Sequence, residues 1–263
     1  GVMNTDNMSI LGLTIDYGPY GWLEDFDPDW TPNTTDAQGR RYRYGQQAQI
    51  AMWNLVRLGN ALYPLIEDVP ALETALGAYA NRYESEWQAM LAAKLGLPAL
   101  VDDADRELAE EALSVLRLAE TDMTIFFRAL AGIPCTADVP PDDIALLAPL
   151  RAASYAPEAL PDAQRNRYLA WVSRWRERVR RDGIPDAPRA ARMQLANPKY
   201  VLRNYLAQEA IDLAEQGDFA RVNDLLDVLR RPYDEQAGHE RYAAKRPEWA
   251  RQRAGCSMLS CSS

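Results

Sequence analysis

The sequence predicts a mainly α-helical fold with one short β-hairpin near the start of the chain. From Gln46 onward, apolar residues recur at helical spacings in several long segments. Residues 1–45 are instead rich in Gly, Pro, Asp, Asn and aromatic residues, which is typical of turns and loops. Within them, the apolar stretch Ile10–Ile15 lies between two turn sequences, which indicates a hairpin over residues 8–17.

Two long helices begin the predicted helical body. The first covers Gln46–Leu62, where apolar residues recur every three or four positions. The second covers Ala71–Leu95. It starts after Pro70 and ends before Gly96, because proline and glycine mark helix boundaries.

Further helical segments follow along the chain. They are Asp103–Ala131 with a break near Thr121, Asp162–Arg181, Asn197–Glu215 and Phe219–Leu229. Residues 132–141 are predicted to form a loop, and the tail from Arg231 is polar. Tyr168, Trp171 and Trp175 fall on one stripe of their helix, which predicts packing in the core and no ligand contact. We therefore divide the chain into loops over 1–45, a helical body over 46–230 and a tail over 231–263.

Charge and hydropathy exclude several classes of function. The 263-residue chain has a formal net charge of −9. Nucleic acids and anionic membranes both require a basic face, so neither is an expected partner. No apolar run approaches the roughly 20 residues that cross a bilayer, and no signal peptide is visible.

The cysteine and histidine content limits which disulfide, catalytic and metal sites are expected in this chain. Cys135, Cys256 and Cys261 are too few and too unevenly placed for a disulfide framework, so a reducing compartment is expected. His239 is the single histidine. A Ser-His-Asp triad or a zinc site with several histidines is therefore not expected within this chain.

Three oxygen-bearing side chains near the start of the chain suit phosphate chemistry. Such chemistry needs a carboxylate to take the proton of an attacking hydroxyl and two oxygen ligands to hold Mg²⁺. Asp6 and Asn7 are adjacent in a turn, and the expected hairpin returns Asp16 to the same cleft. This order of groups is typical of a kinase-like active site, although the gap from Asn7 to Asp16 is shorter than in protein kinases. The same residues also form good turns, so the turn-only interpretation stays open.

The acidic loop around Asp25, Asp27 and Asp29 is a weak candidate for a calcium site. An EF-hand loop requires Gly at its sixth position and Glu at its twelfth. Trp30 and Asp36 stand there instead. The loop is predicted to be solvated and to occupy the place of an activation segment.

At this point the motifs resemble a known family. Residues 1–19, reading Gly-Val-Met-Asn-Thr-Asp-Asn and onward, closely resemble the selenoprotein O family of protein adenylyltransferases. Asn197–Leu206, Arg231–Glu235 and the terminal Cys261-Ser-Ser resemble the same family. The resemblance implies a protein-kinase-like fold, of which this chain would be the helical C-terminal lobe. It also implies transfer of AMP from ATP to Ser, Thr or Tyr hydroxyls of proteins.

The resemblance also implies roles for individual residues. Asp6 would accept the proton, and Asn7 and Asp16 would bind magnesium, with Asp16 also close to the ATP. The expected metal is Mg²⁺, which Mn²⁺ could replace. The resemblance places such a protein in the cytoplasm of a bacterium or in the mitochondrion of a eukaryote.

The chain departs from the family pattern in two places. Gly1 falls inside the first motif, so we expect that the upstream lobe that binds the nucleotide is missing and that the chain alone is inactive. Many members have a cysteine in the loop after the metal-binding aspartate, able to pair with the terminal cysteine or selenocysteine. Pro32 stands at that position here, although Cys261 remains as a possible redox residue.

Three functions therefore remain to be compared. The first is AMP transfer with release of pyrophosphate, and the second is phosphoryl transfer on the same fold with release of ADP. The third is a helical interaction module whose catalytic residues are vestigial. Retention of Asp6, Asn7 and Asp16 together favours the first two, because an interaction module does not need all three.

Overall fold

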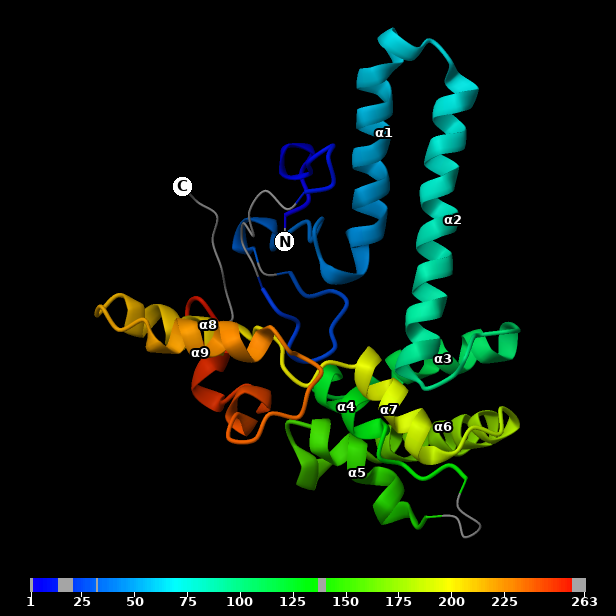
Figure 1. The fold of residues 1–263 in the computed structure, drawn as a ribbon, viewed down its shortest axis with the longest axis vertical. Coiled ribbons are helices and arrows are strands. Elements are labelled where there is room, and N and C mark those ends of the chain that lie inside the picture. The colour runs from blue at the N-terminus through cyan, green and yellow to red at the C-terminus, as the bar shows by residue number, and fades with distance from the viewer. Residues whose placement is uncertain (1, 14–20, 32, 137–140, 257–263) are drawn as a thin grey trace. The chain divides into compact units, whose positions relative to one another are not determined.

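The computed structural model describes residues 2–13, 21–31, 33–136 and 141–256. Over these ranges the fold is mainly helical, as the sequence predicts, and the β structure consists of isolated bridges, among them Asp25–Asp122 and Thr121–Ser154. The α-helices in Figure 1 are α1 (Gln47–Ile66), α2 (Val69–Lys94), α3 (Asp103–Leu116), α4 (Met123–Leu130), α5 (Asp143–Ala153), α6 (Asp162–Arg181), α7 (Asp186–Ala196), α8 (Asn204–Ala214) and α9 (Ala220–Leu229). Short 3₁₀ helices cover Thr5–Asn7, Thr34–Asp36, Tyr44–Gln46, Pro157–Ala159, Glu240–Ala243 and Glu248–Arg251.

The chain forms two compact units. Unit 1 is drawn from residues 1–23, 27–87 and 248–263, and unit 2 from residues 24–26 and 88–247. The boundary falls inside α2. None of the helices in the described ranges combines the length and the apolar composition that crossing a membrane requires.

Unit 1 contains α1 and the first part of α2, two long helices that lie side by side (Figure 1). The hydroxyl of Tyr79 in α2 donates a hydrogen bond of 3.1 Å to the carbonyl of Ala48 in α1. The left-handed conformation of Glu67, with φ of 53°, ends α1. Both predicted helices are confirmed, and α1 continues four residues beyond the predicted end at Leu62.

Unit 2 has a core of aromatic side chains from α4 and α6. Tyr168, Trp171 and Trp175 are fully buried, which confirms their prediction as core residues. Their polar atoms are satisfied inside the protein, because Trp171 Nε1 donates to the Leu108 carbonyl at 2.8 Å and Trp175 Nε1 to the Leu95 carbonyl at 2.9 Å. The α6 helix has the predicted ends.

The break predicted near Thr121 is confirmed. The α3 helix ends at Leu116, and α4 begins at Met123. Asp122 is the N-cap of α4, since its Oδ1 accepts a hydrogen bond of 2.9 Å from the Ile125 amide. One polar residue therefore starts a new helix where the apolar pattern is nearly continuous.

The helix predicted over Asn197–Glu215 is partly wrong. The helix α8 begins at Asn204, and the unpredicted α7 occupies the stretch before Asn197. The Asn197 side chain ends α7, because its Nδ2 donates to the carbonyls of Met193 at 2.9 Å and Lys94 at 3.0 Å. The sequence interpretation took this asparagine as a helix start. It also missed α5.

The expected hairpin over residues 8–17 is only partly described. Residues 8–13 form a bend and a turn without strand structure. In that turn the Gly12 amide donates to the Ser9 carbonyl at 3.0 Å, and Gly12 has a φ of 71°. The remainder of the expected hairpin lies outside the described residues.

Candidate functional site

The candidate site lies on a 3₁₀ turn near the start of unit 1. Asp6 and Asn7 are both exposed on this turn. The backbone amide of Asn7 donates to the Asn4 carbonyl at 3.0 Å, and the Asn7 side-chain Nδ2 donates to the Val2 carbonyl at 2.9 Å. The turn therefore has a defined local structure in which the backbone and side-chain nitrogens of Asn7 both donate hydrogen bonds within the segment.

A buried asparagine on α1 supports this turn. Asn54 is 5% exposed, and its Nδ2 donates to the Met3 carbonyl at 2.8 Å. A buried amide that is hydrogen-bonded to a backbone carbonyl fixes the position of that backbone, because leaving the carbonyl unpaired costs free energy. The Asp6–Asn7 turn is thus connected to α1 three residues before Asp6.

A second contact comes from the loop that precedes α1. The Tyr42 hydroxyl donates a hydrogen bond to Asn4 Oδ1. Tyr42 is in turn positioned by Asp36, whose Oδ2 accepts from the Tyr42 amide and whose Oδ1 accepts from the Arg41 amide, each at 2.8 Å. Asn54 and Asp36 therefore fix the two sides of the segment that carries Asp6.

The oxygen atoms of the candidate site remain available. Among the described residues, Asp6 has no ion pair, and Asn7 Oδ1 accepts no hydrogen bond. An exposed carboxylate and an amide oxygen are hard donors, which suit Mg²⁺. Such a pair can accept a proton from a hydroxyl or bind a hard cation.

Three residues singled out in the sequence lie outside the described residues. They are Asp16, Pro32 and Cys261. Their roles therefore stay predictions. Within the described ranges, no three His, Cys, Asp or Glu side chains lie close enough together to hold a metal ion.

The acidic loop after the first motif has partners within the protein. Asp27 Oδ1 accepts a hydrogen bond of 2.9 Å from the Asp29 amide, and the Asp29 carboxylate lies 3.2 Å from Arg43 Nε. Asp25 belongs to unit 2, where its carboxylate lies 3.8 Å from Arg246. The three acids thus have separate structural roles.

The motif Asn197–Leu206 contributes a buried arginine to unit 2. Arg203 is fully buried, and its Nη1 lies 2.6 Å from both Glu24 Oε2 and Asp122 Oδ2. Burial raises the pKa of Glu24, whereas the neighbouring Arg203 lowers it. The segment 24–26 also forms backbone contacts here, since the Phe26 amide donates to the Thr121 carbonyl at 2.9 Å.

The same motif packs against Arg231–Glu235. Arg128 of α4 donates to the Asn197 carbonyl at 2.9 Å and to Glu235 Oε1 at 2.7 Å. Lys199 Nζ lies 2.5 Å from Glu235 Oε2. The backbone amides of Lys199 and Tyr200 both donate hydrogen bonds to the Pro232 carbonyl. Both motifs therefore stabilise the helical body of unit 2.

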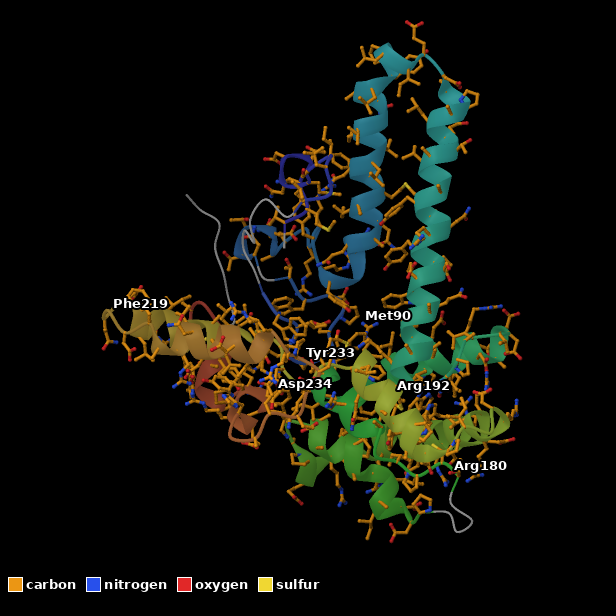
Figure 2. The ribbon with its side chains drawn as sticks, viewed as in Figure 1. Met90, Arg180, Arg192, Phe219, Tyr233 and Asp234 are labelled. Carbon is orange, nitrogen blue, oxygen red and sulfur yellow. The ribbon has the colours of Figure 1, made fainter. Side chains whose placement is uncertain are left out.

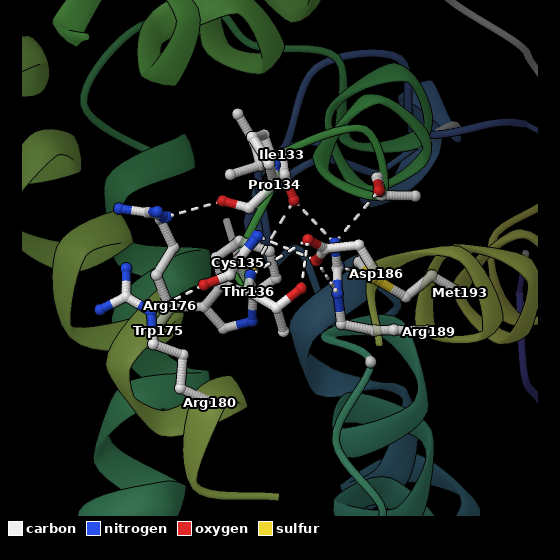
Figure 3. Close-up of polar contacts among 12 residues, drawn as sticks. Ile133, Pro134, Cys135, Thr136, Trp175, Arg176, Arg180, Asp186, Arg189 and Met193 are labelled. Carbon is white, nitrogen blue, oxygen red and sulfur yellow. Dashed lines mark hydrogen bonds and ion pairs between the residues drawn. The ribbon is translucent and has the colours of Figure 1, made fainter. Parts of the chain in front are cut away.

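A further polar cluster, shown in Figure 3, surrounds Cys135 in unit 2. Arg189 is fully buried and donates to the Ile133 carbonyl at 2.6 Å. Burial alone would raise the pKa of Asp186, but hydrogen bonds from the Cys135 and Thr136 amides lower it to about 2. Burial raises the pKa of the Cys135 thiol to about 11. This thiol is therefore protonated near neutral pH and poorly nucleophilic.

Comparison with known proteins assigns the family. The family model described as "Protein adenylyltransferase SelO" matches residues 1–230. The chain belongs to this family. The match includes the Asp6–Asn7 turn and the Arg203 motif, and it confirms the family resemblance predicted from the sequence motifs.

Curated relatives in the SelO family are similar along the whole chain. A "Protein nucleotidyltransferase YdiU" of Rhodopirellula baltica is 56% identical over 269 residues, which cover all of this chain and 50% of the relative. Proteins of the same name from Aromatoleum aromaticum and Nitrosospira multiformis are 56% and 52% identical and are covered over 49% and 50% of their lengths. The chain thus spans about half the length of these relatives.

Sequence reasoning missed the residues that position the SelO-family turn. Asn54 was the detectable one, because an asparagine within the apolar pattern of α1 requires a buried hydrogen-bond partner. Tyr42 and Asp36 do not stand out in this way, because both lie in a loop where polar residues are common and imply no buried partner. Their roles become visible only from the contacts.

Proposed function

We propose that a polypeptide containing this chain transfers AMP from ATP to Ser, Thr or Tyr hydroxyls of proteins. The observation that supports this proposal is the Asp6–Asn7 turn. Asn54 of α1 holds the adjoining backbone by its hydrogen bond to Met3, while Asp6 and Asn7 remain exposed. Membership of a family whose model is described as a protein adenylyltransferase favours AMP as the transferred group.

In the proposed reaction, Asp6 accepts the proton of the substrate hydroxyl. The hydroxyl oxygen then forms a bond to the α-phosphorus of ATP. The bond from the α-phosphorus to the oxygen that bridges to the β-phosphate breaks, and pyrophosphate leaves. Positioning of the hydroxyl by a fixed carboxylate contributes to the rate because proton removal and attack occur in one geometry.

Asn7 and Asp16 are the proposed ligands of Mg²⁺, for which Mn²⁺ could substitute. The described part of the site fits such an ion. The Asn7 side-chain Nδ2 donates a hydrogen bond to the Val2 carbonyl, so the Asn7 Oδ1 is the atom left to coordinate a cation. A bound divalent cation would neutralise negative charge on the phosphate oxygens. The remaining contribution of Asn7 is to orient its oxygen through the hydrogen bond to Val2.

We further propose that this chain needs the other half of a family polypeptide for activity. The curated relatives are about twice as long as the matched region. Transfer depends on the position of the triphosphate, and the residues that hold it are proposed to lie in the part of a family polypeptide that this chain does not span. The 263-residue chain alone is therefore expected to leave proteins unlabelled by ATP.

Labelled ATP distinguishes the competing functions. The test uses a chimera in which this chain replaces the matched region of the R. baltica relative. Label on the α-phosphate should appear in protein, and label on the γ-phosphate should appear in pyrophosphate. Protein labelled from the γ-phosphate would instead identify a phosphotransferase. A folded chimera that transfers neither label would favour the interaction module.

A further inference from the structure

Unit 1 exposes several large apolar side chains near the candidate site and on α1. On the first segment, Ile10 is 80% exposed and Leu11 is 76% exposed. On α1, Leu62 is 37% exposed and Leu65 is 82% exposed. Leu58, Leu62 and Leu65 share one face of α1, because residues three and four positions apart lie above one another. Contiguous exposed apolar surface of this kind marks an interaction site.

A cavity lies within this surface. It has a volume of about 520 Å³ and is bounded by the segment around Asp6 and by one face of α1. Its apolar lining includes Met8, Ile10, Leu55, Leu58 and Ala61. The cavity thus places exposed Ile10 beside Leu58 and Ala61 of α1 in one groove, which we call the α1 groove.

Two polar groups in the α1 groove have unused hydrogen-bonding capacity. Asn54 lines the cavity and is 5% exposed, and its Oδ1 has no hydrogen-bond donor among the described residues. Arg57 also lines the cavity, and within the described ranges its guanidinium contacts the ring of Trp53 at 4.6 Å but no carboxylate. An occupant that complements the groove therefore brings an N–H group, a carboxylate and apolar side chains.

We infer that the α1 groove is the docking surface for the half of a family polypeptide that this chain does not span. The apolar surface extends from the cavity along α1 to Leu65, which is more than a small ligand would cover. The relatives contain as much additional polypeptide again as the matched region. Backbone N–H groups and acidic side chains of that polypeptide would satisfy Asn54 and Arg57. This inference concerns binding and does not depend on AMP transfer.

Co-expression tests the inference directly. This chain, carrying an affinity tag, is produced together with the uncovered half of the R. baltica relative as a separate polypeptide. A one-to-one complex is expected by light scattering after purification. Ile10→Glu and Leu65→Glu place a charge on the apolar surface and should each weaken binding roughly tenfold or more. Both positions are exposed, so both variants should keep the helix content of the unmodified chain.

Exposed apolar residues of unit 2 provide matched controls. Phe219, at the turn between α8 and α9 (Figure 2), is 60% exposed, and Leu226 is 49% exposed. Phe219→Glu and Leu226→Glu should leave binding unchanged. The inference is wrong if no complex forms, or if the controls weaken binding as much as the groove variants. A homodimer that Leu65→Glu dissolves, without any complex with the relative's half, would show that a second copy occupies the groove.

Discussion

The Asp6–Asn7 turn of unit 1 and the Arg203 cluster of unit 2 use polar groups in opposite ways. The turn is positioned by neutral hydrogen bonds, from Asn54 to Met3 at 2.8 Å and from Asn7 to Val2 at 2.9 Å. Its carboxylate is exposed. In unit 2, fully buried Arg203 contacts two carboxylates at 2.6 Å each.

This difference separates the groups that stabilise the protein from those that could react. A buried charge is tolerated only when an opposite charge compensates it, so the Arg203 cluster depends on every member. An exposed carboxylate is free to bind a substrate or a cation, and it adds little to stability. Substitutions at the turn should therefore change activity, and substitutions at the cluster should change stability.

The largest expected effect is on turnover, at the turn. Asp6→Ala removes the proposed proton acceptor and should lower AMP transfer by the chimera roughly 10²–10⁴-fold. ATP binding should stay close to that of the unmodified chimera. Asp16→Ala removes a proposed metal ligand and should weaken both Mg²⁺-dependent ATP binding and turnover. Calorimetry measures the binding, and incorporation of α-labelled AMP measures the rate.

Asp103→Ala is the control for these variants, because Asp103 is an exposed acid in unit 2. Its rate and ATP binding should match those of the unmodified chimera. If Asp6→Ala and Asp16→Ala also react and bind normally, the turn-only interpretation of these residues is correct. AMP transfer would then depend on residues other than Asp6 and Asp16.

The second expected effect is on stability, at the Arg203 cluster. Arg203→Met leaves Glu24 and Asp122 buried without their cation, so it should lower the free energy of unfolding by about 3–5 kcal/mol. Urea unfolding followed by tryptophan fluorescence measures the loss, and Trp171 and Trp175, which are buried in unit 2, contribute to the signal together with the tryptophans of unit 1. Adding Glu24→Gln and Asp122→Asn should recover part of the loss, because the carboxylates are then neutral.

Arg230→Met provides the matched control. Arg230 is 66% exposed and lies 3.2 Å from Asp227, so its loss should change the free energy of unfolding by less than about 1 kcal/mol. Equal losses for Arg203→Met and Arg230→Met would mean that burial does not distinguish the two ion pairs.

A third effect, intermediate in size, should appear where α1 meets the turn. Asn54→Ala leaves the Met3 carbonyl without its donor and should destabilise the turn by about 1–3 kcal/mol. Amide hydrogen exchange in residues 2–13 should become faster, and AMP transfer by the chimera should fall. Asn60→Ala changes an exposed asparagine on the same helix and should affect neither measurement. Unchanged exchange in Asn54→Ala would show that Tyr42 alone positions the segment.

The sequence predicted the long helices well because their apolar residues are periodic over many turns. The ends of α6 follow directly from the pattern that begins at Asp162 and stops at Asp182. Short helices were harder to predict. The α7 helix is only 11 residues long and starts directly after Pro185, with four residues between it and the end of α6.

The candidate site was predictable only where its residues are neighbours in sequence. Asp6 and Asn7 are adjacent, so their shared turn is a local property. Asn54 and Tyr42 contact the same segment from 51 and 38 residues away, and local sequence patterns do not encode such pairs. The Arg203 cluster likewise joins residues separated by 179 and 81 positions.

The smallest expected effect concerns the pH dependence of stability at Asp186 in unit 2. Its pKa of about 2 in the folded protein lies below the value of about 3.9 for an unfolded aspartate. The ionised carboxylate therefore stabilises the folded state above about pH 4, and this contribution is lost as the pH falls towards 2. Asp186→Asn should reduce the free energy of unfolding at pH 5, and the difference from the unmodified chain should shrink at pH 3. Urea unfolding at both pH values measures the two differences. Equal differences would contradict the assignment, because the hydrogen bonds from Cys135 and Thr136 would then stabilise the protein without depending on the charge of Asp186.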